Sequence, residues 1–403
     1  MIKILNIPQY SMYNDEGQVL LDSDSTCRVF INLLEYLKKS GIEYKISFLL
    51  PPKYIPGRFI KQCTEYGVHL YNFPFKNSPI DNRYNFNFDD WESYINDHDI
   101  IWNHIIEITR NIRSILKGKN KKIVSFFHII DFLSENQLVS KWPNGDLYSY
   151  FWRQLDGELS SDISVFNSTG NLKGCEDDLR KLNFPYSNTE RTYLSYFFPE
   201  RSKFIPNKKY KEFTTVFCNR ITSSMYTNWH KAIKLFKDPY TKGRIFFSNP
   251  SNSRGINALI KEFDIVNDVW EEQQTREFGR CLVWNEKIYI SLDDIKYNNF
   301  LDICSKSHAS LSLFEIEYYG GIAHREAIQA GKLIPIQPYV HEFKNWFKDF
   351  DYIDKACYLF TNSNNLSPIV FNDYIENIKY EDISMAKETL DYTLENFEKI
   401  CKL

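Results

Sequence analysis

Short apolar runs alternate with amphipathic stretches along the first half of the chain. Residues 27–39 place apolar side chains at helical spacing and end in two lysines before Gly41. The runs between such stretches are apolar on both faces, as parallel strands between two helix layers are. They are IKILNI, YKISFLL, GVHLYNF, DIIWNHI, KKIVSFFHII and SDISVFNS. The alternation predicts a doubly wound parallel sheet with right-handed crossovers.

A second series of the same kind begins after a charged, proline-bearing segment at 200–211. Its strands are predicted at FTTVFCNR, GRIFFSN, KIYISL and SHASLSLF, with helices near HKAIKLFK and INALIKEF. The last residues again have helical spacing. We therefore expect a first domain at 1–205, a second α/β domain at 206–380, and a C-terminal helix at 381–403 that docks on the first domain.

Composition narrows the class of protein. The chain has 403 residues, of which 43% are hydrophobic and 25% charged, and this balance is that of a globular protein. It has no apolar run of roughly 20 residues and no signal-peptide pattern at its start, so we expect a cytoplasmic protein. Its eight cysteines form no C-x-x-C pair, so neither a zinc site nor a disulfide framework is indicated.

The stretch at 310–338 carries the most specific chemistry. A predicted strand, SLSLF, leads to a turn at Gly320 and Gly321, and the helix IAHREAIQAG follows. Backbone N–H groups of residues 320–322, at the positive end of the helix dipole, suit a diphosphate. Glu326, one turn into the helix, suits a ribose diol. The alternative without a binding function is a simple strand-to-helix connection, which any doubly wound fold contains.

These residues resemble the Leloir glycosyltransferases of the GT-B fold. The matching pairs are Glu326-Ala327, Ala330-Gly331 and Ile334-Pro335. The resemblance implies two Rossmann-like domains with a cleft between them, and transfer of a sugar from a nucleotide sugar, with a UDP-sugar as co-substrate. It implies no required cofactor. No motif encodes a metal site, and a divalent metal remains open.

The resemblance also identifies candidate residues for binding the diphosphate and the sugar of the donor. It implies that Arg220, at the end of VFCNR, and Lys231 neutralise the leaving diphosphate, and both side chains suit phosphate oxygens. The alternative is that Lys231 is a solvent-exposed helix residue that does not bind phosphate. Where many retaining members have an acid, this chain has Tyr318, so Glu317 is the candidate for contacting the sugar, with solvent exposure as its alternative.

The first domain offers a second pair of candidates. His128 follows a predicted strand in FFHIID, and Asp131 lies three positions further on. Sites in parallel sheets form at the carboxyl ends of strands, so these side chains are candidates for meeting the donor sugar and the acceptor hydroxyl. A buried structural histidine is the alternative for His128.

Within the family, short motifs are most similar to those of the DNA α-glucosyltransferases of T-even phages. Those motifs place Thr227, Trp229 and Lys231 after the phosphate arginine, and His324 beside Glu326. They imply a hydroxymethylated pyrimidine in phage DNA as acceptor and the host cytoplasm as location. A surface glycan, glycolipid or protein acceptor, and a non-catalytic binding protein on the same scaffold, stay open, as does the oligomeric state.

A basic segment is the candidate DNA contact, because lysine and arginine side chains neutralise phosphates. A solvated helix end is its alternative. The segment comprises Arg110, Arg113, Lys117, Lys119, Lys121 and Lys122.

Overall fold

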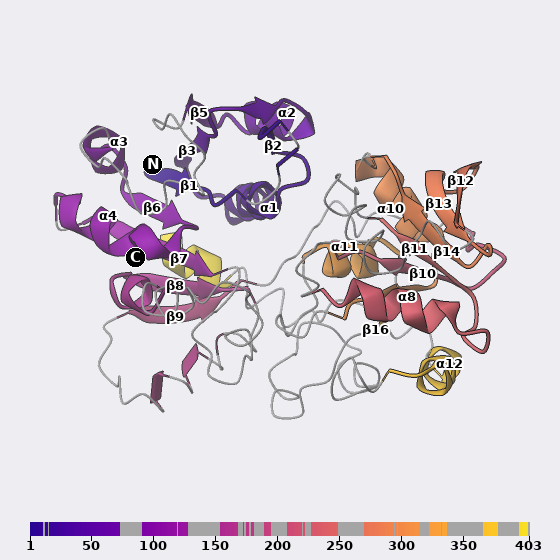
Figure 1. Ribbon diagram of the computed structural model, residues 1–403. Helices are drawn as coiled ribbons and strands as arrows, with labels where there is room; N and C mark the ends of the chain where they lie inside the picture. Colours follow the sequence, from indigo (N-terminus) through magenta and orange to yellow (C-terminus); the bar gives the residue numbers. More distant parts are fainter. Residues whose placement is uncertain are drawn as a thin grey trace. The chain divides into compact units, whose positions relative to one another are not determined.

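The chain divides into two compact units in the computed structural model (Figure 1). One comprises Met1–Phe197 with Leu390–Leu403, and the other Phe198–Thr389. The structure describes residues 1–10, 13–14, 16–72, 91–118, 120–127, 154–167, 172, 175–176, 179–180, 189–194, 208–219, 221, 227–248, 270–293, 295, 297–313, 322–331, 333–336, 366–377 and 395–401.

The seven-stranded sheet of the first unit is parallel throughout, in the order β5-β3-β1-β6-β7-β8-β9. The strands are β1 (Ile2–Ile7), β3 (Tyr44–Leu50), β5 (His69–Asn72), β6 (Ile100–Asn103), β7 (Lys122–Phe127), β8 (Ile163–Phe166) and β9 (Glu190–Tyr193). The sheet grows from β1 toward β5, and the chain then returns to add β6 on the other side of β1. The expected doubly wound topology is confirmed, with its switch point between β1 and β6.

Helices flank this sheet because their apolar stripes need a partner. They are α1 (Ser25–Ser40), α2 (Arg58–Glu65), α3 (Glu92–Asn96), the 3₁₀ turn η2 (Ile106–Ile108) and α4 (Thr109–Ile115). Helix α1 starts where the Asp24 carboxylate accepts the N–H of Thr26, and it ends at Gly41 in the left-handed conformation (φ 64°). Two short strands, β2 (Val19–Leu20) and β4 (Tyr54–Ile55), pair beside this layer.

The helix at 395–401 packs on the first unit, and Figure 1 shows it in yellow beside the strands of that unit. Its Phe397 is fully buried, with ring centroids 5.6 Å from Tyr36 of α1 and 6.3 Å from Trp102 of β6. The side chain of Asn396 donates to the carbonyl oxygen of Tyr193 at 3.1 Å. The end of the chain therefore completes the apolar layer of the first unit.

The second sheet has the order β12-β13-β14-β11-β10-β15-β16. Its parallel strands are β10 (Thr214–Phe217), β11 (Arg244–Phe247), β14 (Ile288–Ser291), β15 (Ala309–Leu311) and β16 (Ile334–Ile336). An antiparallel hairpin of β12 (Trp270–Thr275) and β13 (Gly279–Trp284) extends it beyond β14. The sequence pattern did not predict this hairpin, because WEEQQT is a polar edge strand without an apolar run.

Helices α8 (Trp229–Lys237), α10 (Tyr297–Lys306), α11 (Ile322–Gly331) and α12 (Pro368–Asn377) belong to the second unit. Helices α10 and α11 pack on each other, and Cys304, Ala327 and Ala330 join Val216 and Phe246 of the sheet in one apolar cluster. In the part of the chain that the structure describes, no helix is long and apolar enough to span a bilayer.

Candidate functional site

The switch point of the second sheet lies between β10 and β15. The chain passes from β10 outward to β11 and β14 and then returns to place β15 on the other side of β10. In open α/β sheets, ligands bind at such a point, beyond the carboxyl ends of the strands. Phe217 and Leu311 are partners in register, so β10 and β15 end side by side.

Two asparagines join the segments that leave the sheet there. The amide of Asn219 donates to Ser312 Oγ at 2.7 Å, which ties the end of β10 to the end of β15. The amide of Asn228 donates to the carbonyl oxygen of Leu313 at 2.9 Å. Asn228 precedes α8 in the left-handed conformation (φ 52°), which asparagine adopts more readily than most residues. The sequence pattern indicates neither asparagine, since their roles depend on which strands are neighbours.

In the sequence, the residues predicted for the donor site follow the ends of β10 and β15. Arg220 directly follows Asn219, and Glu317, Gly320 and Gly321 lie in the segment between Leu313 and α11; all four are outside the described residues. Lys231 is partly exposed in the first turn of α8. The backbone of Ile322 begins α11.

Helix α11 returns from the carboxyl edge of the sheet, so its amino terminus lies at that edge. Its Glu326 and His324 are both completely buried. Burial raises the pKa of the Cys304 thiol well above its ordinary value, and contact with Cys218 and the charge of Glu326 act in the same direction. The Glu326 carboxylate therefore lies near Cys304 of α10, inside the second unit. A helix terminus with a carboxylate one turn away suits a nucleoside diphosphate.

At the corresponding switch point of the first sheet, the structure places a histidine that no sequence motif indicates. His104 follows β6 directly, is 1% exposed, and has Nε2 3.2 Å from the side-chain nitrogen of Asn6 in β1. Its ring centroid is 5.3 Å from that of Phe126. The predicted His128 comes directly after the last residue of β7, and both it and Asp131 lie outside the described residues.

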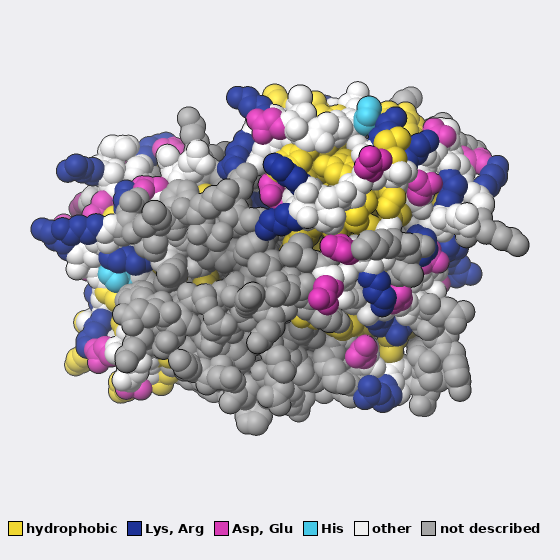
Figure 2. All heavy atoms as spheres, turned by 180° about the vertical axis from the view of Figure 1, so that it is seen from behind, with side chains coloured by type: hydrophobic (Ala, Val, Ile, Leu, Met, Phe, Trp, Pro, Cys, Tyr) yellow, Lys and Arg dark blue, Asp and Glu magenta, His cyan; other side chains and the backbone are white. Residues whose placement is uncertain are grey.

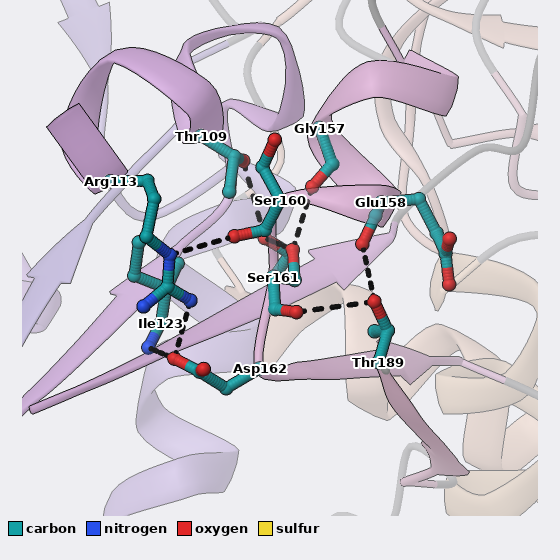
Figure 3. A network of polar contacts seen from close by, with 10 residues as sticks. Thr109, Arg113, Ile123, Gly157, Glu158, Ser160, Ser161, Asp162 and Thr189 are labelled. Atoms are coloured by element: carbon teal, nitrogen blue, oxygen red, sulfur yellow. Dashed lines mark hydrogen bonds and ion pairs between the residues drawn. The ribbon is translucent and has the colours of Figure 1, made fainter. Parts of the chain in front are cut away.

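The basic segment lies at the other edge of the first sheet. The Nε of Arg113 donates to the carbonyl oxygen of Ser160 at 3.1 Å, and its guanidinium pairs with Asp162 at 2.6 Å (Figure 3). Asp162 also accepts the N–H of Ile123 at 2.7 Å, so this network joins α4 to the amino ends of β7 and β8. Buried hydroxyls continue it, with Ser161 Oγ donating to the carbonyl oxygen of Gly157 at 2.8 Å.

Other cations of the segment also have partners within the chain. Arg110 pairs with Asp156 at 3.2 Å, Lys117 pairs with Glu92, and Lys121 donates to the carbonyl oxygens of Asn96 and His98. Lys122 is the first residue of β7, and Lys119 lies outside the described residues. On the face drawn in Figure 2, Lys and Arg side chains of the described surface are mixed with Asp and Glu side chains.

Among the residues that the structure describes, no group of three or more His, Cys, Asp or Glu side chains is arranged to hold a metal ion. The chemistry available at the described part of the site is that of a buried carboxylate, amide and hydroxyl side chains, and a helix amino terminus. These groups bind hydroxyls and phosphates.

Comparison with known proteins shows the fold. No protein-family model matches the sequence. A search of curated proteins found no match. The whole chain superimposes on 95% of sucrose-phosphate synthase from Thermosynechococcus elongatus (TM-score 0.57, 10% identity) and on 98% of a glycosyltransferase from Rickettsia africae (TM-score 0.55, 14% identity). It also superimposes on 97% of an α-glucosyltransferase solved with UDP and a 13-mer DNA containing an HMU base (TM-score 0.50, 12% identity). The chain thus has the two-domain, Rossmann-like fold of the GT-B glycosyltransferases.

Proposed function

We propose that the protein is a glycosyltransferase that uses a nucleotide sugar, with a UDP-sugar as donor. The observation that carries the proposal is the position of α11, which follows the switch-point strand β15, begins at the carboxyl edge of the sheet and holds the buried Glu326 one turn into the helix. The fold is shared with glycosyltransferases, one of them solved with UDP. Fold alone does not determine activity, so the donor site is the part to test.

In this proposal the residues divide into two tasks. Arg220, Lys231 and the N–H groups of residues 320–322 bind the diphosphate and stabilise the negative charge that builds on it as the glycosidic bond breaks. Glu326 accepts hydrogen bonds from the ribose. His128, Asp131 and Glu317 are proposed to contact the transferred sugar and the acceptor hydroxyl, with retention of the donor's anomeric configuration.

For the acceptor we propose a hydroxymethylated pyrimidine in DNA, in a bacteriophage context and therefore in the host cytoplasm. The support is the neighbour solved with DNA containing an HMU base, together with the short motifs around Trp229 and His324. A base inside a duplex has to be flipped out of the stack before a transferase can reach it.

A carbohydrate acceptor is the second candidate, and one observation weakens the case for the basic segment as a DNA contact. Described cations of the basic segment, including Arg113 and Lys121, bind groups of their own chain at the amino ends of the strands. Ligands of doubly wound sheets bind at the opposite edge. The basic segment therefore lends the DNA acceptor no support beyond its composition.

The test is a two-stage assay on the full chain. Thermal shift with UDP, UDP-glucose and other nucleotide sugars identifies the donor, since a ligand that binds the folded state raises the unfolding temperature. Donor turnover is then followed with hydroxymethylated duplex DNA, unmodified DNA or oligosaccharides. Release of UDP that depends on the hydroxymethyl group supports the DNA acceptor, and release that depends only on oligosaccharide supports the second candidate. Binding of no nucleotide sugar would remove the transferase proposal, and NMR of the product's anomeric proton tests retention.

A further inference from the structure

The buried histidine of α11 is hydrogen-bonded to β15, the strand next to the edge strand β16 of the second sheet. The Nδ1 of His324 lies 2.8 Å from Oγ of Ser310, and both residues are 0% exposed. Ser310 is the middle residue of β15, between β10 and β16. A hydrogen bond between two fully buried polar side chains is costly to lose, because the remaining partner keeps its desolvation penalty. This contact therefore holds one defined orientation of α11.

The other end of α11 is held by backbone contacts. A Cβ on Gly331 would come within 2.3 Å of the carbonyl oxygen of Cys304, so the helix ends directly against α10. The ammonium of Lys209 donates to the carbonyl oxygens of Ser307 and Gly331, at 2.5 and 2.8 Å. With this end fixed by the close approach, the His324–Ser310 contact sets the rotation of the end that meets the switch point.

We propose that His324 is a positioning residue of the donor site, acting through Ser310. The inference rests on the proposed nucleotide-sugar function. His324 and Glu326 are two residues apart, about 200° around the helix, so they face nearly opposite sides of α11. Rotation of the helix that breaks the contact with Ser310 moves the Glu326 carboxylate and the N–H groups of the first turn together. Loss of the contact therefore weakens nucleotide binding without removing any group that touches the nucleotide.

The geometry of the hydrogen bond supplies matched variants. The amide of asparagine at position 324 occupies the place of Nδ1 and keeps the bond to Ser310, whereas the amide of glutamine lies near the place of Nε2 and loses it. We expect His324→Asn to bind UDP within about twofold of wild type, and His324→Gln and Ser310→Ala to bind it about tenfold more weakly. Combining His324→Gln with Ser310→Ala should add little to either, because both remove one interaction.

The measurement is calorimetric titration of each folded variant with UDP, alongside its thermal unfolding temperature. Glu326→Gln serves as the control that reports the donor site directly. If UDP binds wild type and Glu326→Gln weakens it, unchanged affinity in His324→Gln and Ser310→Ala overturns the positioning role alone. The same holds if Asn and Gln at position 324 weaken binding equally. If wild type binds neither UDP nor any other nucleoside diphosphate, the proposed function fails and this inference fails with it. Should Ser310→Ala not fold, Ser310→Cys, which is nearly isosteric and a weak hydrogen-bonding partner, takes its place.

Discussion

Gly331 and Cys304 are in backbone contact, because a Cβ on Gly331 would lie only 2.3 Å from the carbonyl oxygen of Cys304. We predict that Gly331→Ala destabilises the protein by about 1 to 3 kcal/mol, as overpacking of a tight contact does. Because α11 has to shift to admit the methyl group, UDP affinity should fall as well. Urea unfolding and calorimetry measure the two effects.

Gly17→Ala is the matched control for this prediction. Gly17 has a positive φ of 72° but open space around its Cβ position, so alanine costs only the left-handed strain of about 1 to 2 kcal/mol. It should leave UDP affinity unchanged, since Gly17 belongs to the other unit. If Gly331→Ala binds UDP as tightly as Gly17→Ala and wild type do, the close approach of α11 to α10 does not govern the donor site.

A second prediction concerns acid stability. Burial lowers the pKa of His308 to about 4, with the charges of Lys209 and Arg244 acting in the same direction, and its Nδ1 accepts the N–H of Thr214 at 3.1 Å. The folded protein thus keeps this ring neutral where the unfolded chain, with a pKa near 6.5, takes up a proton. The contribution of the neutral His308 ring to the free energy of unfolding should be fully present above pH 6.5 and be lost as the pH drops toward 4.

His308→Asn tests this prediction, because asparagine offers an acceptor in the place of Nδ1 but does not titrate. We expect the stability difference between pH 6.5 and 4.5 to shrink by about 1 to 2 kcal/mol in the variant, since solvent screens the partly exposed ring. Urea midpoints across this pH range provide the measurement. Parallel pH curves for variant and wild type would mean that His308 does not contribute to acid unfolding.

The donor-site assignment gives a third prediction. Glu326→Ala and Arg220→Ala should each weaken UDP binding by roughly 1.5 to 3 kcal/mol, the range for a hydrogen bond to a charged group. Calorimetry on folded variants measures it. Lys234→Ala is a control, because Lys234 is an exposed residue of α8 and should leave binding intact. Unchanged affinity in both test variants would contradict the assignment.

Substitutions in the basic segment distinguish a structural role of its cations from a role in binding DNA. Arg113→Gln should lower the unfolding temperature, because it removes the contacts with Ser160 and Asp162. Arg110→Gln should change stability by less than about 1 kcal/mol, since its pair with Asp156 is exposed.

If the segment binds DNA, replacing Arg110 and Lys117 together by Gln lowers the salt dependence of log affinity by about 0.9 per lost phosphate contact. An unchanged slope in a fluorescence-anisotropy salt titration would place the DNA contacts elsewhere.

The sequence by itself determined the class of fold. Strands buried on both faces must be apolar throughout, and helices that cover a sheet must be apolar on one stripe, so both periods are written into the chain. The predicted runs IKILNI, YKISFLL and GRIFFSN contain β1, β3 and β11. Local chemistry also fixed the helix end that was predicted before Gly41. The helix with Glu326 was expected where α11 lies.

Tertiary structure alone decided which residues meet. Strand order is set by long-range packing, so the sequence did not reveal that Asn219 would face Ser312 or that His104 would stand beside Asn6. It also did not show that Arg113 is committed to Asp162, because a lysine- and arginine-rich helix end looks the same whether its charges are solvated or paired. Composition and periodicity report how much of a residue is buried, whereas a site depends on contacts between segments distant in sequence, and only the packed sheet brings those together.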